Sequence, residues 1–291
     1  MLHSLENEYL TVVISDKGGE MQSICVKADG KEYLWQGNPE YWSGRAYNIF
    51  PICGRLTDGK YTYRGKEYEM KLHGFIRDTV MGVEQKSNTE ISFILRSNDT
   101  TKQQYPFDFT YKITYILDGT RIKNIYTVTN DGDELMYFAV GGHPGFNVPL
   151  NAGERFEDYY LEFGCEKPMD LIVMTPIFYT GKTELYPLKD GKIIELNHSL
   201  FSKDARFFTN MCSNVTLKST KSDSFVRLEY PKMRNLGIWH KPQSDAPYIC
   251  IEPWSSVPSY YGVVDDIETK IQMEKLMPND EYVGGFDIII G

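Results

Sequence analysis

The stretch FTYKITYILDGTRIKNIYTVT, residues 109–129, is the part of the sequence that decides the fold. Its two halves, Phe109–Leu117 and Arg121–Thr129, carry apolar residues at nearly alternate positions, and such alternation buries one face of a β-strand. Asp118-Gly119 lies between the halves, and this dipeptide favours a tight turn. The stretch therefore predicts a β-hairpin.

Strand-like runs separated by Gly, Asn and Asp turns continue on both sides of this hairpin. They are Tyr9–Ser15, Met21–Lys27, Glu32–Trp35 and Glu90–Arg96 before it, and Val215–Ser219, Phe225–Tyr230, Leu236–His240, Tyr248–Glu252 and Tyr282–Ile290 after it. Helical periodicity is scarce, and no Pro/Ser-rich linker or charge block divides the chain. We expect residues 1–291 to form a single all-β domain, in which Pro149–Asp158 and Lys167–Lys192 are long surface excursions because they lack periodicity.

Composition disfavours several classes of partner. The formal net charge of −9 argues against nucleic acid, which requires a basic surface to neutralise phosphates. The chain starts without a basic region followed by an apolar stretch, and nowhere do about 18 apolar residues run together. We therefore expect a cytoplasmic protein with no membrane partner. The five cysteines are scattered and include no C-x-x-C pair, so we expect neither a disulfide framework nor a zinc ribbon.

Two histidines stand in glycine-flanked settings that an ordinary core position does not require. They are His73, in the sequence LHGF (72–75), and His143, in GGHPGF (141–146). Glycine permits a close approach of the backbone, as at a ligand site. The alternative for each histidine taken alone is a hydrogen-bonded ring in the core.

Glu252 lies in ICIEPW (249–254), an otherwise apolar run that predicts a buried strand. A buried carboxylate must be paired, protonated or functional, because an unpaired buried charge is strongly destabilising. Pairing with an arginine is one interpretation. The other is a general base, since burial among apolar neighbours such as Trp254 raises the pKa of a carboxyl group toward neutral pH.

Taken together and in order, these motifs resemble the galactose mutarotase-like proteins, called aldose 1-epimerases, and within them the LacX-like branch. The motifs that carry the resemblance are EYLW (32–35), FPICGRL (50–56), LHGF (72–75) with Arg77-Asp78, GHPGFN (142–147) and IEPW (251–254). The resemblance covers nearly the whole chain. It implies a β-supersandwich of large antiparallel sheets, a concave sugar site, and no metal or organic cofactor.

The resemblance also assigns roles to matching positions. It makes Glu252 the base that takes the proton from the anomeric hydroxyl and His143 the acid that protonates the ring oxygen. His73 matches a second histidine that hydrogen-bonds the sugar, and Arg55 matches a sugar-binding arginine. Asp204 is the match for a carboxylate that holds ring hydroxyls.

Aromatic residues in or near the motifs are candidates to stack on the apolar face of a sugar ring. They are Phe75, Phe146, Trp239 and Trp254, with Trp254 favoured because it follows the proposed base and His240 a weaker candidate beside Trp239.

Three alternatives stay open. A hexose-6-phosphate epimerase would use Arg77, close to His73 in the sequence, to hold the phosphate. A non-catalytic carbohydrate-binding protein would need the concave site without an acid and a base. A zinc hydrolase would use two histidines and a glutamate, although no H-x-H or H-E-x-x-H spacing occurs. The expected partner is a small sugar, namely galactose, glucose or a phosphorylated hexose, bound by a monomer or a homodimer.

Overall fold

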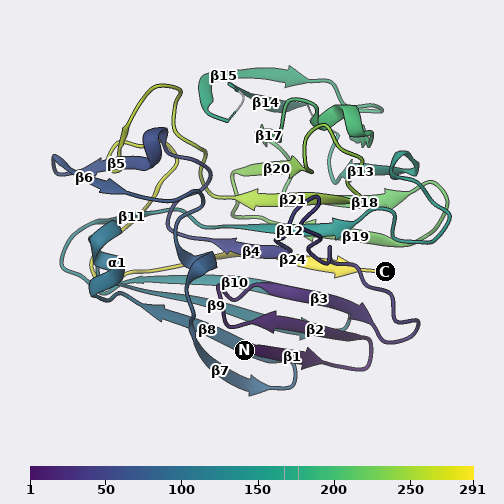
Figure 1. Ribbon diagram of the computed structural model, residues 1–291, viewed down its shortest axis with the longest axis horizontal. Helices are drawn as coiled ribbons and strands as arrows, with labels where there is room; N and C mark the ends of the chain where they lie inside the picture. The colour runs from purple at the N-terminus through teal and green to yellow at the C-terminus, as the bar shows by residue number, and fades with distance from the viewer. Residues whose placement is uncertain (167, 176) are drawn as a thin grey trace.

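A computed structural model describes residues 1–166, 168–175 and 177–291 of the chain, and two large antiparallel sheets form most of it (Figure 1). The nine-stranded sheet contains, in spatial order, β16 (Ile193–Glu195), β13 (Tyr159–Phe163), β18 (Asn214–Ser219), β19 (Phe225–Glu229), β24 (Glu281–Ile290), β10 (Arg121–Asn130), β9 (Phe109–Asp118), β8 (Glu90–Arg96) and β7 (Gly82–Ser87). The seven-stranded sheet contains β15 (Tyr179–Tyr186), β14 (Met169–Met174), β17 (Arg206–Thr209), β20 (Asn235–Trp239), β21 (Tyr248–Trp254), β12 (Gly141–Asn147) and β4 (Ala46–Ile49).

Three smaller sheets and a few short helices complete the described structure. The small sheets are β1 (Leu2–Glu6) with β2 (Leu10–Ser15) and β3 (Met21–Val26), β11 (Met136–Phe138) with β23 (Glu274–Leu276), and β22 (Asp265–Asp266) with β5 (Lys60–Tyr63) and β6 (Lys66–Glu69). The helices are α1 (Asp99–Gln104) and the 3₁₀ turns η1 (Thr57–Gly59), η2 (Ile76–Asp78), η3 (Phe156–Asp158) and η4 (His198–Phe201). Among the helices of the described residues, none has the length and apolar character needed to cross a membrane.

The predicted hairpin is confirmed as β9 and β10, which pair along their whole length. Asp118 is opposite Arg121, so the connecting loop has two residues. Buried and partly exposed positions alternate strictly along both strands. One face of the hairpin therefore belongs to the core, as the alternation of apolar residues predicts.

Strand β12 shows how the two large sheets are layered. A side chain at Gly142 would collide with Phe286 of β24, so this face of β12 packs on the nine-stranded sheet. The Tyr126 hydroxyl of β10 also donates a hydrogen bond of 2.9 Å to the Gly141 carbonyl. Because side chains alternate along a strand, His143 points to the opposite face, away from the nine-stranded sheet.

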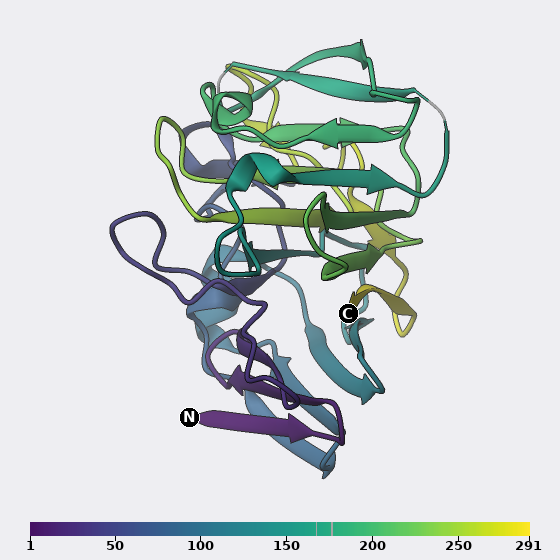
Figure 2. The same ribbon diagram turned by 90° about the vertical axis from the view of Figure 1, so that its right-hand side faces the viewer.

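The sheet of β1, β2 and β3 packs on the nine-stranded sheet at the end formed by β8 and β9. Gly19, in the β2–β3 turn, lies against Phe93 of β8 and Ile113 of β9. Both views show the amino-terminal strands, drawn in purple, gathered beside β7 and β8 at one end, with β14 and β15 at the other (Figures 1 and 2). The all-β fold class of large antiparallel sheets is thus confirmed.

Two local predictions are wrong. Glu32–Trp35 makes only isolated bridges, and the Glu32 carboxylate accepts hydrogen bonds from the backbone N–H groups of Ile24 and Leu34. The span 167–192, predicted as a surface excursion, contains the β14–β15 hairpin, while positions 167 and 176 lie outside the described residues.

The prediction about cysteines is also wrong in one respect. Cys165 and Cys212 form a disulfide across 47 residues of sequence. Cys165 follows β13 and Cys212 lies between β17 and β18, so the fold brings together two cysteines that carry no local spacing signal. Cys25, Cys53 and Cys250 are free.

Candidate active site

His143 and Glu252 face each other across neighbouring strands of the seven-stranded sheet. In the antiparallel β12–β21 ladder, Gly145 pairs with Cys250, and this register places the residue two earlier on β12 opposite the residue two later on β21. His143 Nε2 lies 3.3 Å from Glu252 Oε2. The residues are only 6% and 2% exposed, so the contact is sheltered from bulk water.

On the strands to either side, β4 and β20, the residues opposite this pair extend the site across the sheet. Tyr47 of β4 is opposite His143, and its ring centroid lies 4.6 Å from the imidazole centroid. Gly237 of β20 is opposite Glu252. Because glycine has no side chain, Phe207 of β17 occupies the space beside the carboxylate, and a Cβ at position 237 would collide with it.

His73 reaches the site from a turn rather than from a strand. Its own backbone is left-handed, with φ of 64°. The backbone N–H of Gly54 donates to His73 Nδ1 over 3.2 Å, and the N–H of His73 donates back to the Gly54 carbonyl over 2.9 Å. Since Nδ1 accepts a hydrogen bond, a neutral His73 carries its proton on Nε2 and acts as a donor there.

A cavity of about 330 Å³ opens over this face of the sheet. All seven side chains predicted as site residues line it: His73, His143, Glu252, Arg55, Arg77, Asp204 and Trp254. Its volume lies at the lower end of the range for small-molecule sites, about 300–1,000 Å³. The cavity is therefore suited to a single small ligand, such as one sugar ring.

Burial sets the protonation of the central groups. It lowers the pKa of His143 to about 3. It raises the pKa of Glu252 well above its ordinary value, and the charge of nearby Asp204 acts in the same direction. The pKa of His73 is lowered by burial and then by the cationic groups around it. Both shifts favour imidazole with carboxylic acid over imidazolium with carboxylate.

Asp204 and Trp239 form a polar edge of the cavity. Trp239 Nε1 donates to Asp204 Oδ1 over 2.8 Å, so the indole fixes one carboxylate oxygen and leaves the other for a ligand. Trp239 is thus a member of the site. His240, its predicted companion, is fully buried, hydrogen-bonds His198 over 3.2 Å, and does not line the cavity.

Two arginines provide positive charge at the cavity. The Arg77 guanidinium lies over the Tyr47 ring, with Cζ 5.3 Å from its centroid. Arg55 is exposed, on the segment that also carries Gly54. Within the described residues, neither arginine forms an ion pair with a carboxylate. Both are therefore available to an anionic or polar ligand.

Sequence reasoning missed part of the lining and misplaced two aromatic residues. Trp42, Tyr47, Leu72, Met174, Phe207 and Pro258 line the cavity without lying at a predicted site position. No signal in the sequence marks Tyr47, because its position opposite His143 depends on the pairing of β4 with β12. Phe75 and Phe146, predicted as stacking residues, are buried in the core instead and do not line the cavity.

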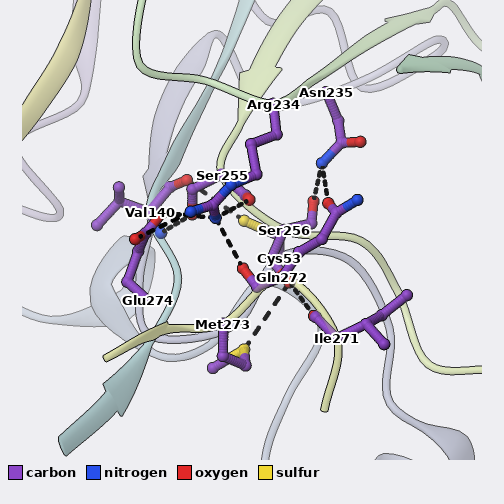
Figure 3. A network of polar contacts seen from close by, with 10 residues as sticks. All are labelled: Cys53, Val140, Arg234, Asn235, Ser255, Ser256, Ile271, Gln272, Met273 and Glu274. Carbon is purple, nitrogen blue, oxygen red and sulfur yellow. Dashed lines mark hydrogen bonds and ion pairs between the residues drawn. The ribbon is translucent and has the colours of Figure 1, made fainter. Parts of the chain in front are cut away.

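A polar network holds together the ends of the strands that carry His143 and Glu252 (Figure 3). The backbone of Val140, just before β12, and Ser255, just after β21, exchange two hydrogen bonds of 2.9 Å. Arg234, just before β20, donates to the Ser255 carbonyl over 3.1 Å. Because these bonds fix one end of each strand, they fix the register that brings His143 opposite Glu252.

Comparisons with known proteins agree along the whole chain. The sequence profile described as aldose 1-epimerase matches residues 1–264. The plasmid-encoded protein LacX of Lactococcus lactis subsp. lactis is 35% identical over 100% of this chain and 99% of its own length.

Solved structures are similar over the same extent. A galactose mutarotase related enzyme from Lactobacillus acidophilus superposes with a TM-score of 0.95 at 34% identity, over 100% of this chain and 97% of that chain. A galactose mutarotase-like protein from Lactobacillus casei ATCC 334 gives a TM-score of 0.95 at 31% identity, over 100% of both chains. The predicted galactose mutarotase-like fold is thereby confirmed.

Proposed function

The chain belongs to the aldose 1-epimerase family, and from this premise we propose that it interconverts the α and β anomers of an aldohexose by opening and reclosing the sugar ring. The observation that carries the proposal is the 3.3 Å contact between His143 Nε2 and Glu252 Oε2 at the wall of a cavity of sugar size. Anomerisation moves protons on two oxygens, O1 and the ring oxygen, which share carbon C1. One acid and one base, a few ångströms apart, can therefore serve both atoms.

Ring opening begins once a proton has passed from the Glu252 carboxyl group to His143 across their 3.3 Å contact, which gives the imidazolium and carboxylate forms of the pair. Glu252 takes the proton from the O1 hydroxyl while His143 gives a proton to the ring oxygen. The C1–O5 bond breaks, C1 and O1 become an aldehyde, and the pair is left as carboxylic acid and imidazole. Burial favours this second protonation state, as the directions of both pKa shifts indicate.

Reclosure reverses the two transfers. Rotation about C1–C2 presents the other face of the aldehyde to the O5 hydroxyl. As O5 attacks C1, His143 removes the hydroxyl proton and Glu252 returns a proton to O1. The opposite anomer forms, the pair regains its starting protonation, and no net proton is consumed.

The remaining residues bind and orient the sugar. His73 donates from Nε2 to a ring or neighbouring oxygen, because its Nδ1 is occupied by Gly54 N–H. The free oxygen of Asp204 accepts from a sugar hydroxyl, and Arg55 donates to another. Trp254, which is 2% exposed, offers its ring to an apolar C–H face.

Polarimetry of a freshly dissolved single anomer tests the proposal. The protein is expected to accelerate relaxation well above the spontaneous rate. Glu252→Gln keeps the shape of the side chain but removes the base, so it should lower turnover by at least about 10²-fold. Equal relaxation rates with wild type, with Glu252→Gln and without protein would refute aldose 1-epimerase activity. The alternative of a non-catalytic sugar-binding protein would then stand.

His143→Asn tests the acid separately. Loss of the proton donor should reduce turnover by about 10² to 10⁴-fold. The far-ultraviolet circular dichroism and the unfolding midpoint of the variant serve as the control for folding. Near-normal turnover in a folded variant would remove His143 from the mechanism.

A hexose-6-phosphate is the second candidate substrate, favoured by the two arginines that have no carboxylate partner among the described residues. Guanidinium groups bind phosphate through paired hydrogen bonds. Comparing kcat/KM for galactose and glucose with that for their 6-phosphates decides between the candidates. A preference for the phosphorylated sugar above about 100-fold, lost in Arg77→Gln, would reassign the substrate.

A further inference from the structure

Cys250 lies beside the His143–Glu252 pair, although the proposed reaction does not use it. It stands two positions before Glu252 on β21, so both side chains lie on the same face of the sheet. Cys250 is fully buried and belongs to a small hydrophobic cluster against which Trp42 and Trp239, two residues of the cavity wall, pack. The thiol is therefore held close to the reacting groups.

The ligand atoms of three side chains converge at this point. The imidazole nitrogen of His143, Sγ of Cys250 and a carboxylate oxygen of Glu252 all lie within 4.8 Å of one another. All three residues are buried. We propose that they form a site for one thiophilic divalent metal ion, of the Zn²⁺ or Cd²⁺ class, and that occupation of this site inhibits the enzyme.

The geometry is close to what such an ion requires. Tetrahedral coordination at usual zinc bond lengths separates ligand atoms by about 3.3–3.8 Å. The His143–Glu252 distance of 3.3 Å already has this value. Small side-chain rotations bring the thiolate of Cys250 into range. The fourth position then faces the cavity and is left to a water molecule or a sugar hydroxyl.

Charge also suits a divalent ion. Thiolate and carboxylate together neutralise the two positive charges, so the buried site as a whole stays neutral. Starting from imidazole, thiol and carboxylic acid, binding releases two protons to solvent. Thiolate and imidazole ligands select zinc-like ions over Mg²⁺ and Ca²⁺. This ligand set differs from the two histidines and a glutamate of a zinc hydrolase, because His73 Nδ1 is bonded to Gly54 N–H.

Metal binding stands independently of the proposed function, whereas inhibition rests on it. An ion on His143 Nε2 and Glu252 occupies both proton-transfer atoms. One equivalent of Cd²⁺ should thus reduce anomerisation to about a twentieth or less, and a chelator should restore it.

The thiolate-to-cadmium charge-transfer absorption reports binding without any activity assay. Titration of wild type with Cd²⁺ should give this band with saturation at one equivalent, and Mg²⁺ should give none. The buffer contains no reductant, so that the Cys165–Cys212 disulfide contributes no thiols. Cys250→Ala should lose the band, while Cys25→Ala, which alters a half-buried free cysteine elsewhere, should keep it.

The inference is overturned by absence of the band in wild type, or by a band that persists unchanged in Cys250→Ala. Glu252→Gln provides a second arm if Cys250→Ala does not fold. It keeps the thiol but removes one ligand, and it should weaken Cd²⁺ binding by at least about tenfold. Unchanged affinity in that variant also counts against the site. A protein that binds Cd²⁺ at this site but accelerates no anomerisation contradicts the proposed function and leaves the metal site standing.

Discussion

At the scale of single residues, His143 and Glu252 together hold two exchangeable protons, which can be distributed between them in two ways. Imidazole with carboxylic acid and imidazolium with carboxylate differ only by one proton moved across the 3.3 Å contact. The pair therefore titrates as a unit, and its macroscopic pKa values belong to both residues. Burial separates these values, because it lowers the pKa of His143 and raises that of Glu252.

This separation predicts an unusual pH profile. Independent groups with the ordinary pKa values of 4.5 for Glu and 6.5 for His would confine activity to a narrow bell between them. In this protein the His143–Glu252 pair gains a third proton only as pH falls toward the His143 pKa of about 3. The second proton is lost only as pH rises through the raised pKa of Glu252. We expect kcat/KM to stay level from about pH 4 until pH reaches the raised pKa of Glu252, and then to fall about tenfold per pH unit.

Polarimetric rates across pH, corrected for spontaneous and hydroxide-catalysed mutarotation, measure this profile. The decline on the alkaline side should disappear in Glu252→Gln, whose residual rate has no carboxyl group to titrate. A maximum between pH 4.5 and 6.5 with losses on both sides would show instead that burial does not govern the pair.

At the scale of elements, the turn that carries His73 depends on glycine at the next position. Gly74 has φ of 76°, and a Cβ there would overlap the carbonyl of Phe50. The same approach lets Phe75 N–H donate to the Phe50 carbonyl over 3.1 Å. The turn and the strand end at Phe50 are thus held together, which positions the imidazole of His73 in the cavity.

Gly74→Ala and Gly30→Ala form a matched pair that isolates this contact. Gly30 has φ of 74°, but a methyl group added there would meet no atom of the described residues within 4 Å. Both variants bear the cost of a left-handed alanine, about 1–2 kcal/mol. Gly74→Ala adds a backbone collision, so its unfolding free energy should drop by at least about 3 kcal/mol in total. Urea unfolding measures both, and equal losses would mean that the close approach is not important.

Strands with a strong alternation were predictable, and the exposed edge strand β15 was not. The β9–β10 hairpin has one buried face over ten residues in each strand, so apolar alternation marks it. Strand β15 lies at the edge of the seven-stranded sheet, and most of its residues are exposed. Its pairing with β14 comes from backbone hydrogen bonds, which leave no trace in the pattern of apolar residues.

At the scale of the whole molecule, the site was predictable as a set of motifs but not as a set of contacts. The glycine-flanked histidines and the carboxylate in an apolar strand are unusual locally, so His73, His143 and Glu252 stand out in the sequence. Trp42 has no such signal. Its ring centroid lies 5.0 Å from that of His143, because β4, which follows Trp42, pairs with β12, and pairing between strands so far apart in the sequence is not encoded in local pattern.

The Cys165–Cys212 disulfide links the two ends of the segment that supplies Asp204 and Phe207 to the cavity. Closing a loop of 47 residues limits the unfolded chain, and the stabilisation should be about 2–4 kcal/mol. Reduction of wild type, or the double substitution Cys165→Ala with Cys212→Ala, should lower the unfolding free energy by that amount in chemical denaturation. Cys25→Ala keeps the bridge, so it should retain sensitivity to reductant, whereas the double variant should have none. If reductant leaves the wild-type transition in place, the bridge does not stabilise the fold, and the cavity residues between its two ends are held by the sheet alone.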